Sequence, residues 1–488
     1  MTLSLALANA VTGLRANTAQ TELISNNVSN ALTEGYSRKD IVLSPSAPGG
    51  QGSGVRIDAT VRAIAPGVTE ARRLSAADAG DGKARAEALA RLAAVTGEPG
   101  EQFALATAAD AFDAALAATA DTPESAPLLN AAVGSATNYV SAVTRVAAEA
   151  MALRTEADSS IAKQVNVVND TLGKVLSLNM EIKARQVSGG DSTALEDERA
   201  RLIERITSMI PIKVVPREFG EVAIFAKNGA QLLDGNVFEL EFTPTPLVTP
   251  DRTLANGGLS GISINGFAMR IGEGGNAGFL DGGSLSAAFE LRDSILPRVG
   301  ATLDGMAADL IGRTQGLAAD PTLAPGAAGL FTDGGLAFDP ANLTGLALRL
   351  EVNPAVDPDR GGEPFRLRDG IGAAAPGEVG EDSLLRGLQD AMRELRIPPA
   401  GTELTTQRDA AGFAAEFSAS ILSRSATSDS ELAFRQGRTD GLAEAELTRI
   451  GVDTDQELAR LLVVEQAFRA NARVVQVVDE LLERLTNL

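Results

Sequence analysis

The sequence predicts a mostly α-helical protein with inserted β structure. Apolar residues recur at heptad spacing near both ends of the chain, no Gly or Pro interrupts residues 135–172, and β-branched residues begin to alternate at residue 212. Heptads are typical of coiled coils, long uninterrupted helices of bundles, and period-two alternation of strands. We therefore predict a coiled coil of the N- and C-terminal helices, an elongated helical-bundle domain and a smaller, β-rich outer domain.

Composition narrows the range of functions. Of the 488 residues, 44% are hydrophobic but only 4% are aromatic, which favours slim helical packing over bulky cores. A net charge of −21 is unsuited to nucleic acid or to anionic membrane surfaces. The chain has neither Cys nor His, which excludes disulfides, thiolate zinc sites, a cysteine nucleophile and the commonest general base. We expect a protein that is not an enzyme, needs no cofactor or metal, and binds neither nucleic acid nor membrane.

The first expected element is an axial helix, followed by a connector, within residues 1–62. Its seam steps alternately by four and three residues, the period of a left-handed coiled coil. The seam positions are Leu3, Leu7, Ala10, Leu14, Asn17, Thr21, Ile24 and Val28. The single Asn in this seam is a device that fixes register at some cost in stability. No basic segment precedes the apolar residues, so we expect no cleaved signal peptide.

A turn ends this helix within the stretch NNVSNALTEGYSRKD, residues 26–40. Asn and Ser favour a helix end, because their side chains compete for backbone hydrogen bonds. The glycine permits the chain to turn, and the tyrosine beside it can pack the turn. The residues assigned to this turn are Asn26, Asn27, Asn30, Gly35 and Tyr36.

The last expected element, residues 446–488, is a second axial helix that pairs with residues 1–62. Its seam positions are Leu461, Val464, Phe468, Asn471, Val475, Val478, Leu482 and Leu485, again with one Asn. Two interpretations remain open. Either two amphipathic helices pack on one ordinary domain, or the two ends pair with each other and present their remaining apolar faces to other copies. Polar seam positions make either helix marginal by itself.

Residues 63–211 are predicted to form a helical rod domain, with helix from about Ala71. A third heptad seam is Ile161, Val165, Val168, Leu172, Val175, Asn179 and Ile182. The pair Gly189-Gly190 ends one helix, and Asp191 or Ser192 can cap the next, which Pro211 stops.

An inserted β domain is predicted for residues 212–283. The segments IKVV, EVAIFA and VFELEF have strand composition, and Asn228-Gly229 and Asp234-Gly235 are turn signals between them. After the insert, residues 284–320 form a return helix of the helical domain.

The remaining segments alternate between mixed and helical structure. Residues 321–377 are predicted to be a mixed β and loop segment, and residues 378–445 to contribute further helices to the helical domain. The residues that mark strands in the mixed segment are Phe331, Leu348, Leu350 and Val352.

Three motifs invite a chemical interpretation that their pattern does not support. The run Glu196-Asp197-Glu198 cannot converge on one metal ion, because consecutive helical residues point in different directions. We interpret it as a charged, solvated helix start. The stretch GEGGNAG, residues 272–278, lacks the Lys and the Ser or Thr of a phosphate loop. The stretch DPDRGG, residues 357–362, lacks the spacing of a calcium-binding hand.

The two ends of the chain resemble the rod and hook axial-protein superfamily of bacterial flagella. The resemblance rests on NNVSNALTEGYSRKD and on EQAFRANARVVQVVDELLERLTNL, residues 465–488, with Ala467-Phe468, Asn471 and the final Leu-Thr-Asn-Leu. Because rod, hook and hook-associated proteins share these ends, they indicate the superfamily and not the member.

The middle of the chain is similar to the family of first hook-associated proteins. The resemblance rests on Gly189-Gly190 with the following LEDER run, on Asn228-Gly229 with Leu232-Leu233, and on Gly282-Gly283-Ser284-Leu285 with Arg292-Asp293. Several motifs in the same order along one chain make this similarity specific. It leaves only residues 321–440 weakly matched.

The resemblance implies a non-enzymatic, self-assembling structural protein of the extracellular flagellum, at the hook–filament junction. The implied partners are further copies of the chain, hook protein, the next hook-associated protein and an export chaperone at the C-terminal helix. Two alternatives remain open: a hook or distal-rod protein of the same superfamily, and a secreted hydrolase or adhesin with helical ends. A hook protein would be richer in β structure, and the lack of His weighs against a hydrolase.

Overall fold

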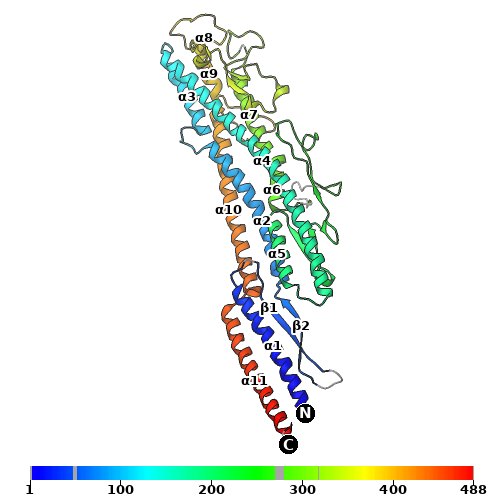
Figure 1. Ribbon diagram of the computed structural model, residues 1–488. Coiled ribbons are helices and arrows are strands. Elements are labelled where there is room, and N and C mark those ends of the chain that lie inside the picture. Colours follow the sequence, from blue (N-terminus) through cyan, green and yellow to red (C-terminus); the bar gives the residue numbers. More distant parts are fainter. Residues whose placement is uncertain are drawn as a thin grey trace. The chain divides into compact units, whose positions relative to one another are not determined.

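The structure is a computed structural model that describes residues 3–33, 35–47, 52–269, 278, 280–316 and 318–486. The chain divides into two compact units (Figure 1). The terminal unit comprises Met1–Asp78, Val167–Glu239 and Arg435–Leu488, and the central unit comprises Ala79–Asn166 and Leu240–Phe434. Helices α2 (Pro66–Thr96), α4 (Ala126–Val187) and α10 (Ala410–Ile450) contribute residues to both units.

In the terminal unit, the first and last helices pair as predicted. Helices α1 (Leu3–Ser29) and α11 (Thr454–Thr486) lie side by side (Figure 1). A break at residues 451–453 separates α11 from α10. It begins at Gly451, whose N–H closes the end of α10, and Asp453 then caps α11 by accepting hydrogen bonds from Asp455 N and Gln456 N.

A two-stranded ribbon follows α1. Strands β1 (Lys39–Pro45) and β2 (Val55–Arg62) are antiparallel, with Lys39 opposite Arg62 and an irregularity after Val42. An isolated two-stranded ribbon is marginally stable in water, so its contacts with α1 matter. Thr12 Oγ1 accepts a hydrogen bond from Val55 N at 3.2 Å, which ties the ribbon to the first half of α1.

Helix α5 (Thr193–Thr207) and a three-stranded sheet complete the terminal unit. The sheet has the order β3 (Ile212–Pro216), β4 (Val222–Ala226) and β5 (Gln231–Leu233), all antiparallel, with a 3-10 turn at Glu218–Gly220. The first two strands match the predicted IKVV and EVAIFA. The positive φ angles of Gly229 and Gly235 explain why both predicted turns need glycine.

The third predicted seam is buried along α4. Its seven positions, Ile161, Val165, Val168, Leu172, Val175, Asn179 and Ile182, are at most 4% exposed. The polar member does not serve register control, because Asn179 holds the start of β4, the central strand of the sheet. Its Nδ2 donates to Val222 O at 2.8 Å, and its Oδ1 accepts from Val222 N and from Arg199.

The central unit contains the main hydrophobic core. Besides parts of α2, α4 and α10, it holds α3 (Leu105–Asp121), α6 (Gly283–Glu290), α7 (Leu296–Thr314), α8 (Phe365–Asp369) and α9 (Ser383–Arg393). Many core positions are Ala, and its few aromatic side chains fill the remaining space. Phe112 and Phe331, for example, meet edge to face with their ring centroids 5.7 Å apart.

The small strands of the central unit correct two details of the sequence analysis. The predicted strand VFELEF shrinks to β6 (Leu240–Glu241), which pairs with β7 (Ser263–Ile264), and that with β8 (Phe267–Ala268). Strands β9 (Phe331–Asp333) and β10 (Leu350–Val352) form as predicted. Leu348, however, ends the 3-10 turn Leu346–Leu348, because the chain must turn there before β10 begins. Further 3-10 turns are Pro340–Asn342 and Pro358–Arg360.

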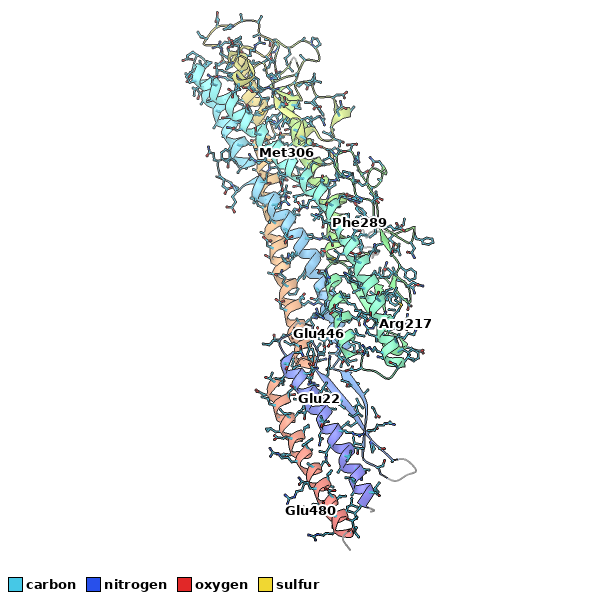
Figure 2. The ribbon with its side chains drawn as sticks, viewed as in Figure 1. Glu22, Arg217, Phe289, Met306, Glu446 and Glu480 are labelled. Carbon is cyan, nitrogen blue, oxygen red and sulfur yellow. The ribbon has the colours of Figure 1, made fainter. Side chains whose placement is uncertain are left out.

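A buried ion pair anchors the loop before β7 to the helices of the central unit. Arg292 lies in a π-helical turn, Leu291–Ile295, and its Nη1 donates to Asp158 Oδ1 at 2.7 Å; neither side chain is exposed. The other oxygen, Asp158 Oδ2, accepts from Thr245 N. Figure 2 shows Phe289 and Met306 on helices of this unit, and Arg292 stacks over the Phe289 ring.

The mostly helical fold with small antiparallel sheets and paired terminal helices confirms the predicted fold class. Within the described ranges, no helix is long and apolar enough to cross a membrane. The glycine-rich stretch 272–278 lies outside the described residues except for Gly278.

Candidate assembly site

The α1–α11 pair buries only part of each predicted seam. On α1, Ala10, Asn17 and Ile24 are buried; on α11, Val464 and Val478 are buried. The other predicted positions on these helices are partly buried or exposed: Leu3, Leu7, Leu14, Thr21, Val28, Leu461, Phe468, Asn471, Val475, Leu482 and Leu485. The pairing thus brings the seams together but leaves much of the α11 seam uncovered in the free chain.

The two seam asparagines meet different surroundings. Asn471 packs against Gly13, where a Cβ atom would lie 2.8 Å from its Nδ2, so α11 approaches α1 closely at a residue without a side chain. Asn17 is 8% exposed, and its Nδ2 has no hydrogen-bond partner in the described part of the chain. A buried amide without a partner carries a desolvation cost of about 1–3 kcal/mol.

A second apolar stripe on α11 escaped the sequence analysis. Its members are Val463, Ala467, Ala470, Val474, Val477 and Leu481, and they also step by four and three residues. Val463 is 66% exposed, and Val474, Val477 and Leu481 are between 43% and 47% exposed. The heptad search could have found this stripe, because it lies one residue before the predicted seam at each step.

At the turn, Asn27 uses its whole side-chain amide. Its Nδ2 donates to Lys39 O at 2.9 Å and to Glu457 Oε2 at 3.2 Å. Its Oδ1 accepts from Lys39 N at 3.1 Å and from the Tyr36 hydroxyl at 2.8 Å. One residue of α1 therefore joins the turn, the ribbon and the start of α11.

The other predicted turn residues have narrower roles. Asn26 and Asn30 are hydrogen-bonded to each other on the surface. Gly35 has φ +76°, and a Cβ atom there would collide with the aliphatic part of the Arg201 side chain. Glycine is required at this position both for its backbone conformation and for its lack of a side chain.

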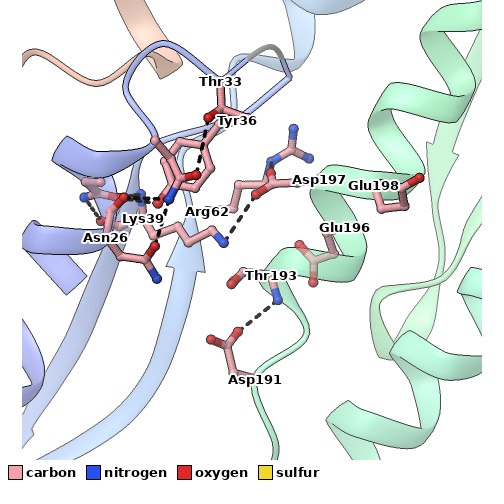
Figure 3. Close-up of polar contacts among 12 residues, drawn as sticks. Asn26, Thr33, Tyr36, Lys39, Arg62, Asp191, Thr193, Glu196, Asp197 and Glu198 are labelled. Atoms are coloured by element: carbon pink, nitrogen blue, oxygen red, sulfur yellow. Dashed lines mark hydrogen bonds and ion pairs between the residues drawn. The ribbon is translucent and has the colours of Figure 1, made fainter. Parts of the chain in front are cut away.

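Behind the turn lies a carboxylate shared by two cations. Lys39 Nζ and Arg62 Nε lie 3.3 Å and 2.8 Å from the two oxygens of Asp197, on α5 (Figure 3). Burial raises the pKa of Asp197, and the two cations oppose that shift. The interpretation of residues 196–198 as a solvated helix start is therefore wrong for Asp197, which is 7% exposed because it pairs with the ribbon.

The same surroundings keep Tyr36 neutral. Burial, followed by the negative charges of Asp197 and Glu457, raises the pKa of the Tyr36 phenol to about 12. Glu457 is itself buried, and Arg460 joins it to Asp40 on the ribbon. Sequence reasoning missed Lys39, Arg62 and Glu457, because their charges have no local pattern and meet only in the fold.

The geometry of these contacts suits assembly. Among the described residues, no group of three or more Asp or Glu side chains could hold a metal ion. What the terminal unit presents instead is a helix pair with an uncovered apolar stripe and a polar network that fixes the orientation of that pair within the unit.

Comparisons with known proteins agree with this geometry. Residues 89–320 match the family described as flagellar hook-associated protein FlgK helical domain, and residues 446–488 match the flagellar basal body rod FlgEFG protein C-terminal family. Flagellar hook-associated protein 1 of Bacillus subtilis (strain 168) is 24% identical, in an alignment that covers 99% of this chain and 97% of the relative.

A solved structure, that of the flagellar hook junction protein FlgK from Burkholderia pseudomallei, aligns over 54% of this chain and 47% of its own length, with 18% identity and a TM-score of 0.42. Family membership rests on the two matched families, which cover separate parts of the chain, and on the relative aligned over nearly all of it. The chain therefore belongs to the FlgK family of flagellar hook-associated proteins, which are structural components of the hook–filament junction and not enzymes.

Proposed function

We propose that copies of this chain assemble at the hook–filament junction by covering the apolar stripe of α11, and that hook protein and the next hook-associated protein contact the assembly at its two ends. The observation that carries the proposal is the stripe itself, from Val463 to Leu481, whose Val and Leu side chains remain between 43% and 66% exposed although α1 already lies against the neighbouring seam. Exposed contiguous apolar surface marks a site of protein contact.

The expected gain is large enough to drive assembly. Full burial of a Val or Leu side chain stabilises a complex by about 1.5–3 kcal/mol, and half of each stripe side chain is still available. Several such side chains per helix, repeated in each copy, favour a polymer over the monomer. The partly exposed Phe468 of the predicted seam adds to this surface.

Family membership gives the location of the protein but not its route of export. The chain is a component of the extracellular flagellum. That it is exported without a cleaved signal peptide, with a chaperone over the C-terminal helix until assembly, belongs to the proposal. The uncovered stripe supports it, because such a surface in a free chain is prone to aggregation.

The alternative of a hook or distal-rod protein gains no specific support. The C-terminal match is to a rod and hook family, but the match over residues 89–320 is to the helical domain of hook-associated proteins. No observation in the described residues favours a hydrolase or an adhesin.

Two variants test the proposal, one in the apolar stripe and one in the predicted seam. Val477→Asp and Phe468→Asp each place a charge in an apolar contact, which costs several kcal/mol, roughly, when no partner compensates it. We expect both to abolish assembly and swimming when they replace the protein in a deletion strain, while circular dichroism of the free chain stays unchanged. Gln466→Asp, on an exposed and polar position of the same helix, is the matched control.

The deletion strain itself defines the position of the protein. We expect microscopy with antibodies to hook and flagellin to show finished hooks without filaments, and flagellin in the medium. Cells without hooks would indicate a rod or hook role instead. Swimming of the Val477→Asp strain at the control level would show that the stripe is not the assembly surface.

A further inference from the structure

The terminal unit contains a groove of about 830 Å³ beside the turn, which we call the junction groove. It is bordered by residues 35–37, by the linker between β2 and α2, by one face of α5 and by the last turns of α10. Two large apolar side chains on its rim are uncovered: Ile64 is 70% exposed and Leu447 is 64% exposed. The contacts that stabilise the turn leave these two side chains without a partner among the described residues.

Six arginines line the junction groove, and most of them have an acidic partner. Arg62 pairs with Asp197, and Arg201 pairs with Glu198. Arg72 and Arg73 are engaged by Glu204 and Glu446. Arg205 is exposed and forms no ion pair with any described residue. A groove with two uncovered apolar side chains on its rim and an unpaired Arg205 fits a partner segment that combines leucines with carboxylates.

A buried hydroxyl also lacks a partner at the groove. Ser37 is 1% exposed, and its Oγ makes no hydrogen bond within the described ranges. Because that oxygen is already inaccessible to solvent, a segment docked in the groove does not reach it, and this hydroxyl does not identify the docked segment.

The end of α11 has the complementary chemistry. Its last two turns read DELLERL, residues 479–485, with Leu482 and Leu485 exposed at 40% and 59%. Asp479, Glu480 and Glu483 form no ion pair with any described residue, and Arg484 is the one cation among them. Glu483 lies in the last turn of α11, where the helix dipole disfavours a carboxylate, and a cationic partner would offset that cost.

The end of α11 cannot reach the groove of its own chain. The groove adjoins Ile450, just before α11 begins, whereas DELLERL lies at the other end of this uninterrupted helix. Figure 2 shows Glu446 and Glu480 far apart in the terminal unit. A helix of that length spans roughly 50 Å. DELLERL could therefore enter the junction groove of another copy only.

We propose that the C-terminal end of α11 of one copy docks in the junction groove of the next copy, with Leu482 and Leu485 against Ile64 and Leu447, and the carboxylates facing Arg205. Such a contact joins two different surfaces, so it repeats from copy to copy and builds a ring or a helical row. The inference rests on the proposed function, since it specifies how the copies meet.

Engineered cysteines test the contact directly, because the native chain has no Cys. The full-length variants Leu447→Cys and Leu482→Cys, separately and together, replace the protein in cells, and isolated hook–filament junctions are treated with a short bismaleimide. We expect a ladder of cross-linked species for the double variant, a dimer for a mixture of the single variants, and only monomer for either alone. Cross-linking no greater than for Leu482→Cys with Val379→Cys, an exposed residue of the central unit, overturns the proposal.

A charge exchange tests the electrostatic part. Arg205→Glu and Glu483→Arg should each lower the number of copies per isolated hook about tenfold, and the two together should restore it. Unchanged copy number in both single variants, or no restoration in the double variant, overturns the docking. The Val477→Asp test of the stripe is independent of this result, so failure of the docking and failure of the proposed assembly surface are distinguishable.

Discussion

Two heptad seams of this chain look alike in sequence and differ in the fold. The seam of α4 from Ile161 to Ile182 and the seam of α11 from Leu461 to Leu485 both step by four and three residues with one Asn. Every position of the α4 seam is buried, whereas Phe468, Leu482 and Leu485 of α11 are at least 40% exposed. Heptad spacing thus indicates which face of a helix is to be covered, but not whether the same chain covers it.

The difference has a physical origin in the number of available partners. Several elements of its own chain pack against α4, including the start of strand β4, which Asn179 holds. By contrast, α1 covers one side of α11 and leaves the Val and Leu side chains of the second stripe between 43% and 66% exposed. The α4 seam therefore stabilises the free chain. The exposed surfaces of α11 contribute to stability only when copies assemble.

The largest expected effect is the difference in unfolding free energy between truncating a side chain of the α4 seam and truncating one of the α11 seam. Leu172→Ala removes a fully buried side chain and should lower the free energy of unfolding by about 2–5 kcal/mol. Leu482→Ala, on the exposed part of α11, should change it by about 0.5 kcal/mol or less. Denaturant unfolding of the free chain, followed by circular dichroism, measures both. Equal losses would show that α11 is as well packed in the monomer as α4.

The next effect concerns the network that orders the terminal helices. Asn27→Ala leaves Lys39, Tyr36 and Glu457 without their shared partner, and each buried group without a partner costs about 1–3 kcal/mol. We expect limited proteolysis of the free chain to trim residues 1–45 and 446–488 before the rest, and faster in this variant. Asn26→Ala, on the exposed neighbouring residue, is the control and should be cut at the wild-type rate.

A smaller effect is expected at the turn glycine. Gly35→Ala imposes a left-handed conformation on a residue with a side chain, at a cost of about 1–2 kcal/mol, and its Cβ collides with Arg201. Trimming of residues 1–45 should accelerate, but the unfolding of the central unit should not change. Gly229→Ala, also at positive φ but with open space around it, isolates the contribution of backbone strain from that of the collision.

The smallest effect is a titration that involves only the buried network. The pKa of Tyr36 is raised from 10.0 to about 12, and burial also raises that of Tyr139. Because the folded state holds the phenol proton more tightly, its contribution to stability is complete below pH 10.0 and is lost as the pH rises to about 12. Tyr139→Phe leaves Tyr36 as the one tyrosine of the chain. In this variant, the absorbance of the Tyr36 phenolate should show a single transition near the raised pKa. A midpoint near 10.0 would mean that Tyr36 is exposed to solvent.

Local patterns in the sequence determined many elements of this protein. Heptad spacing located the terminal helices and the α4 seam. The change from heptad spacing to alternating β-branched residues located β3 and β4. Glycines with turn chemistry marked Gly35, Gly229 and Gly235, all of which have positive φ. These features depend on backbone preferences and on the side-chain period of a single element, so neighbouring residues carry the information.

Tertiary structure decided which residues act together. Lys39, Arg62 and Asp197 are far apart along the chain, and Asn27 meets Glu457 across 430 positions. Charge in a sequence is compatible with either solvation or pairing, and only folding determined that Asp197 is buried. The same holds for the extent of the α11 surface, because heptad spacing alone does not specify how much of α11 a partner helix covers. The sequence thus determined the helices and their faces, and the fold decided which faces were left for other copies, because burial depends on neighbours that no local pattern specifies.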